Sequence, residues 1–347
     1  YRPDARGYDG PAFQGNPGFN LDNRGKRSVA IDLERPEGRD LVYRLAEQAD
    51  IYITNLIPRR AAKFGLGPAQ VRKRNKRLIF VQFTGFGAIG PEKDKLGFDY
   101  VGFWARSGIM ANLGEPSGPP VLQRPGMGDH ATALGLAAAM IAALYHRERT
   151  GKGQYLQGSL LHTGLWVLGA DVQVAIETGR EPRRRSRAEP QHALWNTYRT
   201  KDDEWIMLAA PNMTFWPRLC RALELGDLAD DPEIQTIEGQ MANSARVTQA
   251  FEASFGSKTL RQMKPRLDAE DLIWSVVTPI RKAIVDKQAA LNEMIVETPE
   301  ETGAFRTVSM PVRFSDSFVE PRGPAPEIGQ HTEEVLVESG LTWDEIG

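Results

Sequence analysis

Strand-like and helical stretches alternate over residues 26–84, and this alternation restricts the possible folds more than any other feature of the sequence. Three apolar, β-branched runs read SVAIDL (28–33), IYITNL (51–56) and LIFVQFT (78–84). A helical pattern that opens at Pro36 separates the first two runs, and basic helical sequence separates the second and third. Strand, helix and strand at this spacing predict βαβ units in a parallel sheet.

Length and composition divide the rest of the chain. At about 100–200 residues per domain, 347 residues predict two domains. A polar, basic stretch over 180–190 marks a linker, and a hairpin pattern over 195–210 and several helical segments follow it. We therefore expect a large domain over 1–185, a small α+β domain over 190–305, and a return of 306–347 to the large domain.

Charge and cysteine content exclude several classes of function. The chain has 43 Lys and Arg against 45 Asp and Glu, a net charge of −2, which argues against a nucleic-acid partner. Cys220 is the only cysteine, so the chain can form neither an internal disulfide nor a metal site of several cysteines. The histidines show no metal-type spacing, and we expect no metal site. The cytoplasm is the expected compartment.

An Ala-rich stretch, ATALGLAAAMIAALY over 131–145, is the most apolar part of the sequence. It is shorter than the roughly 20 residues that a bilayer requires, and a charged segment, HRER, follows it. We expect a buried helix here and no membrane partner.

Gly-x-Gly-x-x-Gly spacing occurs in GFGAIG (85–90), directly after the third strand-like run. Binding of a nicotinamide dinucleotide requires a helix to open there and an acid about 20 residues later, but Pro91 follows, and Met110 and Ala111 stand where the acid is needed. The motif therefore predicts a loop at the carboxyl edge of the sheet, where open α/β sheets bind ligands, and not a dehydrogenase.

Asp129 stands in GMGDH (126–130), immediately before the Ala-rich helix. One interpretation is an N-cap, a position that aspartate fills well. The other is catalytic, because a helix N-terminus favours an ionised carboxylate and the small Gly128 lets a substrate approach the backbone. An ionised, accessible carboxylate can attack an activated acyl group. The spacing alone leaves both interpretations open.

Six segments, in order along the chain, resemble the CaiB/BaiF family of class III CoA-transferases, which includes formyl-CoA transferase. They are KRSVAIDLERPEGRDLVYRLAEQADIYITN, TGFGAIGP, GDH with the helix after it, TGKGQ, AAPNMTFWPRLC and PEIGQHTEEVL. The resemblance implies an α/β protein with a Rossmann-like large domain on an open parallel sheet, a smaller α+β domain and an interlocked homodimer. It places Tyr1 after the family's first βα unit, so we expect the family's N-terminal segment to be absent.

The resemblance also implies a reaction and its substrates. It identifies Asp129 as the nucleophile of an enzyme that moves CoA from an acyl-CoA donor to a carboxylic acid. The route passes through an aspartyl anhydride and an aspartyl-CoA thioester, and no metal or redox cofactor takes part.

The residues expected to bind CoA or to shape its site lie in three parts of the chain. They are Arg35, Asn55, Lys63, Phe64, Lys95 and Gly128. Basic side chains suit the phosphates of CoA. Glu34 stands where relatives carry a lysine, so the neighbouring Arg35 is a substitute for that contact.

Two other functions remain possible at this stage. The α-methylacyl-CoA racemases of the same family also use a histidine and a glutamate for proton transfer. Phe98 and Asn212 occupy those positions here, and neither performs acid–base work at neutral pH, which favours transfer over racemisation or epimerisation. The other alternative is an acyl-CoA-binding protein without turnover.

Overall fold

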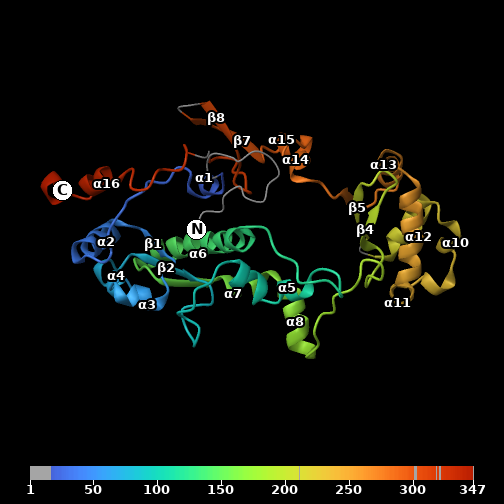
Figure 1. The fold of residues 1–347 in the computed structure, drawn as a ribbon, viewed down its shortest axis with the longest axis horizontal. Helices are drawn as coiled ribbons and strands as arrows, with labels where there is room; N and C mark the ends of the chain where they lie inside the picture. Colours follow the sequence, from blue (N-terminus) through green and yellow to red (C-terminus); the bar gives the residue numbers. More distant parts are fainter. Residues whose placement is uncertain (1–16, 211, 301–302, 318, 320–321, 347) are drawn as a thin grey trace. The chain divides into compact units, whose positions relative to one another are not determined.

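The computed structural model describes residues 17–210, 212–300, 303–317, 319 and 322–346, which form two compact units (Figure 1). The large unit contains the residues up to Ala111, then Leu122–Glu181 and the residues from Lys287 onward; the small unit contains Asn112–Val121 and Pro182–Asp286. Residues 112–121 and 182–185, predicted in the large domain, belong to the small unit, whereas 287–300 and 303–305, predicted in the small domain, belong to the large unit. The first sixteen residues of the predicted large domain lie outside the described residues.

A parallel sheet forms the centre of the large unit. Within the described residues it consists of β1 (Ile51–Thr54), β2 (Ile79–Thr84) and β3 (Tyr155–Ser159), with β2 in the middle. Ile51 pairs with Ile79, which sets the register of the first two strands. The central strand is an almost continuous buried apolar run, as expected for a parallel strand that is covered on both faces. These strands confirm a mixed α/β fold with a parallel sheet.

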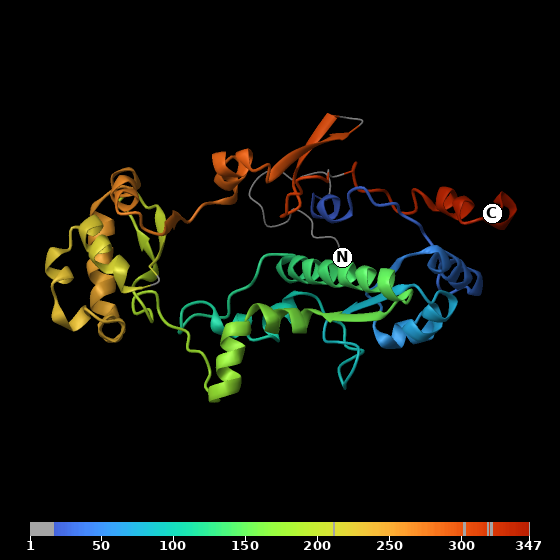
Figure 2. The same ribbon diagram turned by 180° about the vertical axis from the view of Figure 1, so that it is seen from behind.

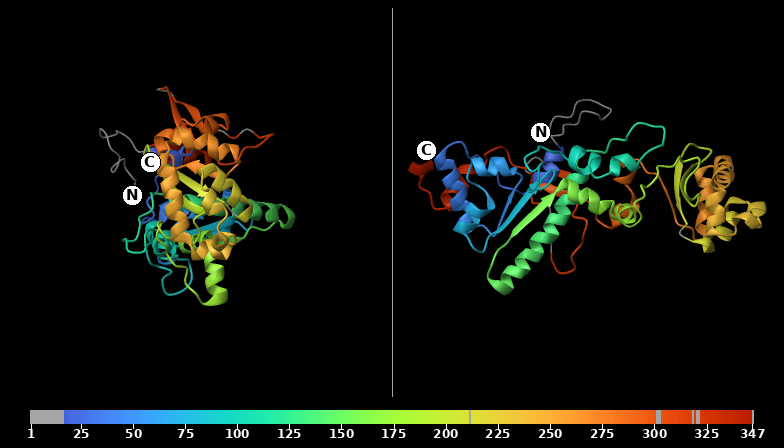
Figure 3. Two further views of the ribbon diagram at one scale, coloured as in Figure 1. Left: turned by 90° about the vertical axis from the view of Figure 1, so that its right-hand side faces the viewer. Right: turned by 90° about the horizontal axis from the view of Figure 1, so that it is seen from below.

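Helices cover both faces of this sheet. On one face lie α2 (Pro36–Gln48) and α4 (Pro68–Arg74), with α3 (Pro58–Lys63) between them in the chain. Each begins with a proline, whose fixed φ suits the first turn of a helix. On the other face lies α6 (Met127–Thr150), and Figure 3 shows it running along β3 (Tyr155–Ser159).

Residues 28–33 form no strand, so this part of the sequence prediction is wrong. Their backbone instead bonds to a segment near the C-terminus. The His331 N–H donates to the Ser28 carbonyl at 2.9 Å, and the Ser28 N–H donates to Nδ1 of His331 at 3.1 Å. The Ala30 N–H donates to Oγ1 of Thr332 at 2.9 Å. An apolar, β-branched run can stay outside a sheet when other groups satisfy its N–H and C=O groups.

α6 is longer and more exposed than the sequence indicated. It has 24 residues, where the Ala-rich pattern predicted 131–145, and only 17% of its most apolar window is buried, where a buried helix was expected. Two glycines in the left-handed conformation bound it, Gly126 with a φ of 81° and Gly151 with a φ of 72°. By length and composition it is the one described helix that could cross a membrane.

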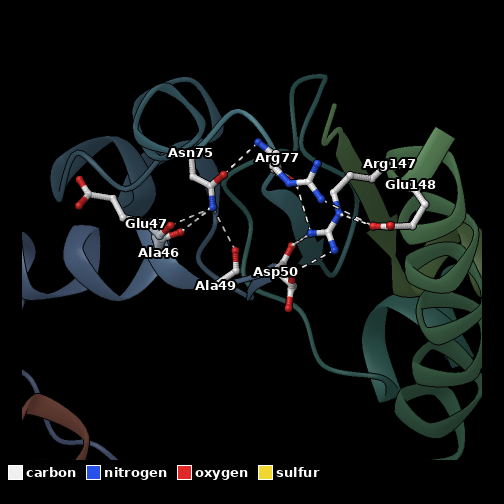
Figure 4. A network of polar contacts seen from close by, with 8 residues as sticks. All are labelled: Ala46, Glu47, Ala49, Asp50, Asn75, Arg77, Arg147 and Glu148. Atoms are coloured by element: carbon white, nitrogen blue, oxygen red, sulfur yellow. Dashed lines mark hydrogen bonds and ion pairs between the residues drawn. The ribbon is translucent and has the colours of Figure 1, made fainter. Parts of the chain in front are cut away.

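A polar network holds the C-terminal end of α6 against the sheet (Figure 4). The guanidinium of Arg147, only 8% exposed, pairs with Oδ1 of Asp50 at 2.9 Å and donates to the carbonyls of Asp50 and Arg77 at 3.4 and 3.5 Å. Nearby, Nδ2 of Asn75 donates to the carbonyls of Ala46, Glu47 and Ala49. The last carbonyls of α2 thus gain the partners that a helix end lacks.

The small unit is built on an antiparallel sheet, and Figure 2 shows its helices gathered beside that sheet. The strands are β4 (Trp195–Arg199), β5 (Trp205–Ala209) and β6 (Trp274–Val276), which confirms the predicted hairpin. The ring of Tyr198 stacks on that of Phe255 at 5.0 Å in its core. The helices that pack on this core are α9 (Trp216–Leu223), α12 (Ser244–Ser257) and α13 (Leu260–Ala269).

The remaining elements are short. They are α1 (Pro17–Asn23), the π-helix η1 (Tyr100–Ala105), α5 (Ile109–Asn112), α7 (Leu160–Val167), α8 (Gly169–Thr178), the 3-10 helices η2 (Met213–Phe215) and η3 (Pro232–Ile234), α10 (Gly226–Ala229), α11 (Ile237–Ala242), α14 (Ile280–Ala283), α15 (Lys287–Leu291), β7 (Ile295–Glu300), β8 (Gly303–Val308), α16 (Thr332–Glu338) and α17 (Trp343–Ile346).

Candidate active site

Asp129 is the third residue of α6. The N-cap of this helix is Gly126, whose left-handed backbone turns the chain into the helix, so the capping interpretation of Asp129 is wrong. Asp129 is exposed, and its carboxylate forms no hydrogen bond or ion pair with another described residue. A carboxylate in the first turn of a helix is favoured in its ionised form. This one is therefore available to a substrate.

Close packing fixes the backbone beside Asp129. A Cβ on Gly128 would lie 2.5 Å from Cγ of Phe103, so only glycine fits there. Phe103 is buried within η1, which follows the loop after β2. On the helix side, Oγ1 of the buried Thr132 donates to the Gly128 carbonyl at 2.7 Å. The space that Gly128 leaves open is therefore filled by an aromatic ring that holds the helix start in place.

Three ionisable groups surround the Asp129 carboxyl. Although the residue is exposed, the surrounding protein removes part of the water around its carboxyl, which raises its pKa above the ordinary value of 3.8; the carboxylates of Asp99 and Asp22 add to the rise, whereas His130 opposes it. Nε2 of His130 in turn lies 3.0 Å from Oδ1 of Asp22 in α1. A raised pKa makes a carboxylate more basic, and hence a better nucleophile once it is ionised.

The residues predicted to hold CoA near β1 lie at the start of α2, directly after β1 and at the end of α3. Nζ of Lys63 pairs with Oε1 of Glu34 at 2.5 Å and lies 5.0 Å from the centre of the Phe64 ring. Phe64 is only 6% exposed and packs in the core under α2 and α4, so it offers little surface to a ligand. Arg35 and Asn55 are exposed, the first at the N-cap of α2 and the second directly after β1.

Lys95 lies in the loop that follows β2. Its Nζ pairs with Oε1 of Glu92 at 2.9 Å and lies 5.0 Å from the centre of the Phe86 ring. A shallow hollow of about 170 Å³ opens beside it, lined by Phe86, Lys95, Val101, Ala105 and Arg106. No helix opens within GFGAIG, as the argument against a dinucleotide site predicts.

The structure places the predicted residues on several elements of the large unit, and the Arg59 N–H of α3 donates to Oδ1 of Asp94, next to Lys95, at 2.6 Å. Asp129 and Gly128 lie at the start of α6, Lys63 and Phe64 lie at the end of α3, and Lys95 lies in the loop after β2. The sequence reasoning missed Asp99 and Asp22 as neighbours of Asp129. Asp99 carried a signal, because it directly follows Phe98 in a segment already compared with the racemases; Asp22 carried none.

The two positions that distinguish racemases hold residues without acid–base function. Phe98 is 63% exposed. Asn212, in the small unit, uses its Oδ1 to accept from the Thr214 N–H at 3.0 Å, which caps the short helix η2. Within the part of the chain that the structure describes, no group of three or more His, Cys, Asp or Glu side chains is placed to hold a metal ion.

Comparison with known proteins gives a consistent result. Residues 2–332 match CoA-transferase family III. The chain is 31% identical to the (R)-2-hydroxy-4-methylpentanoate CoA-transferase of Clostridioides difficile, over 95% of this chain and 83% of that protein. It is also 31% identical to the succinate–glutarate CoA-transferase of Agrobacterium fabrum, over 96% of this chain and 85% of that protein.

Solved structures show the same relationship. A CaiB/BaiF family protein from Brucella suis superimposes with a TM-score of 0.81 at 28% identity, over 97% of this chain and 86% of that one. The fold and the sequence match agree with each other. The chain therefore belongs to CoA-transferase family III, the CaiB/BaiF family, and is an enzyme that transfers CoA between acids.

Proposed function

We propose that Asp129 is the nucleophile of this CoA transfer. Its carboxylate attacks the acyl-CoA thioester carbonyl, which forms a mixed anhydride and releases CoA thiolate. The thiolate then attacks the aspartyl carbonyl of the anhydride, which releases the donor acid and leaves an aspartyl-CoA thioester. The acceptor carboxylate attacks that thioester to form a second anhydride and free thiolate, and the thiolate takes the acceptor acyl group and regenerates Asp129.

One observation supports this assignment most strongly. The Asp129 carboxylate is exposed in the first turn of α6 and has no partner among the described residues, although the backbone beneath it is fixed by Phe103 and Thr132. A side chain with a structural role would be expected to bond to its surroundings. A fixed backbone that presents an unbonded carboxylate meets the positional demand of nucleophilic catalysis.

The basic residues supply a CoA site by their charge. Arg35 at the N-cap of α2, Lys63 at the end of α3 and Lys95 in the loop after β2 are exposed cations, and Asn55, directly after β1, adds a neutral donor. The ion pairs of Lys63 with Glu34 and of Lys95 with Glu92 are on the surface, so each is worth little and can be exchanged for a phosphate.

The exchange reaction tests the assignment. We expect Asp129→Asn to lower the rate of CoA exchange by at least about 10³-fold, as removal of a covalent nucleophile does. The acceptor panel would contain 2-hydroxy-4-methylpentanoate, phenyllactate, succinate and glutarate, the acids named for the relatives. Asp171→Asn, which removes an exposed carboxylate from α8, is the matched control and should keep full activity.

Racemisation is distinguished in the same experiment. A transferase requires the acceptor acid, whereas a racemase exchanges the α-hydrogen of an acyl-CoA with solvent in the absence of any acid. Deuterium incorporation at Cα without an acceptor, or full exchange by Asp129→Asn, would overturn the proposal.

A further inference from the structure

Asp99 is a buried carboxylate that bridges two elements beside Asp129. The residue is only 3% exposed, and both of its oxygens accept hydrogen bonds from the backbone. Oδ1 accepts from the Tyr100 N–H at 2.9 Å, and Oδ2 accepts from the Gly126 N–H at 3.0 Å. Burying a carboxylate is costly unless its oxygens are satisfied, so these two bonds define what this side chain does.

The two bonds join the start of η1 to the turn that opens α6. Asp99 is the N-cap of η1, and its own carbonyl accepts from the N–H groups of Phe103 and Trp104. Gly126 is the left-handed N-cap of α6, three residues before Asp129. The same two elements meet again where the Phe103 ring fills the space above Gly128. The Asp99 carboxylate therefore bonds to both elements of this joint, the start of η1 and the Gly126 turn that precedes Asp129.

We propose that Asp99 is a positioning residue for the reaction, in that its carboxylate fixes the Gly126 turn and thereby the orientation of Asp129. The inference rests on the proposed function, because it assumes that Asp129 is the nucleophile. Asp99 does not touch the substrate in this scheme. It acts through the Gly126 N–H, and its charge also acts on the Asp129 carboxyl across the joint.

The Asp99→Asn variant tests whether Asp99 controls the position and charge environment of Asp129 without a general loss of structure. Asparagine has nearly the same size but only one acceptor oxygen, so one of the two backbone N–H groups faces an amide NH₂. We expect the kcat of CoA exchange to fall about 10²-fold, because a displacement of a catalytic group by about 1 Å causes a loss of that size. The KM for acyl-CoA should change little. Hydrogen exchange measured by mass spectrometry should become faster in the peptide that spans residues 124–132.

The pH profile supplies a readout that structural damage alone would not give. Asp99, Asp22 and His130 are the charged or titratable groups around Asp129, and the Asp99→Asn variant removes the charge of Asp99 alone. Loss of a like charge lowers the pKa of Asp129, so the acidic limb of kcat against pH should move to lower pH in Asp99→Asn. Asp171→Asn serves again as the control and should leave kcat, hydrogen exchange and the acidic limb unchanged.

The outcomes separate the two proposals. If Asp129→Asn is inactive but Asp99→Asn has the kcat, the acidic limb and the hydrogen exchange of the parent protein, the role of Asp99 is refuted and the nucleophile stands. If Asp129→Asn is fully active, the proposed function fails. Faster hydrogen exchange in the peptide 124–132 of Asp99→Asn would then still show that Asp99 holds the Gly126 turn, but it would give Asp99 no role in the reaction.

Discussion

At the scale of single residues, the chemistry depends on the protonation state of Asp129. Its pKa is raised above 3.8 because the surrounding protein removes part of the water around the carboxyl, which disfavours the charged form, and because Asp99 and Asp22 repel it. Only the ionised carboxylate attacks a thioester. The surroundings that make the ionised Asp129 carboxylate less stable therefore also make it more reactive toward the thioester.

The first prediction follows from the direction of this shift. As pH falls, the fraction of ionised Asp129 falls once pH approaches its raised pKa, so kcat should decline at a higher pH than an ordinary aspartate would give. A pH series of CoA exchange at saturating substrates measures this limb. An acidic limb at or below the pKa of a free aspartate would contradict the environment described for Asp129.

At the scale of helices and strands, the start of α6 is held by packing that tolerates no added atom. Gly128→Ala should destabilise the protein by about 1–3 kcal/mol, because its Cβ meets the buried Phe103 ring at 2.5 Å. The matched control is Gly256→Ala in α12, where a Cβ meets nothing within 4 Å and helix propensity alone favours alanine by roughly 1 kcal/mol. Urea unfolding of both variants should give changes of opposite sign.

The other end of α6 gives a prediction about the network of Figure 4. Arg147→Ala removes the side-chain donor to the Arg77 carbonyl and one of the two donors to the Asp50 carbonyl, which also accepts from the Ile79 N–H, and should cost about 1–3 kcal/mol of unfolding free energy. Asp50→Asn should cost less than about 1 kcal/mol, because the Asp50 side chain is 76% exposed. Equal losses in the two variants would show that the ion pair, and not the carbonyl contacts, holds the helix end.

The elements also show which part of the fold could be predicted from the sequence. The strand-like runs at 51–56 and 78–84 joined the sheet, because their alternate side chains fill two opposite apolar cores. The run at 28–33 has the same composition, but its partners at 329–332 lie some 300 residues away, where no local pattern could indicate them. The full length of α6 was missed because it begins at a left-handed glycine and not at a capping side chain.

The candidate site shows a similar limit. Asp129 was identified by its place before an Ala-rich helix and by the resemblance to the family. The role of Asp99 could not be read from the sequence, since it depends on a hydrogen bond between residues that are 27 positions apart. The burial of Phe64 in the core likewise follows from tertiary packing, which spacing does not reveal.

At the scale of the whole molecule, we propose that a second copy of the chain covers α6. Apolar side chains on this helix stand exposed, with Leu134 at 56%, Ile141 at 66% and Tyr145 at 63%, and Trp166 of α7 is 81% exposed. Exposed apolar surface of this extent is typical of association sites. A homodimer of the interlocked kind that the family resemblance implies would bury it.

The prediction is a particle of twice the chain mass of 38.6 kDa by light scattering, and a shift toward monomer in Ile141→Asp. Glu148→Gln, at the charged end of the same helix, is the control and should remain dimeric. A monomeric parent protein that sediments with vesicles would contradict the dimer and would assign α6 to a membrane instead.

The most direct test of the whole account is a covalent trap at Asp129. The protein is mixed with acyl-CoA without an acceptor acid, treated with hydroxylamine, digested, and examined by peptide mass spectrometry. The account predicts a hydroxamate on Asp129, formed from the aspartyl anhydride or thioester, and no such product in Asp129→Asn. An unmodified Asp129 peptide in protein that is shown to be active, or a hydroxamate on another carboxylate, would contradict it.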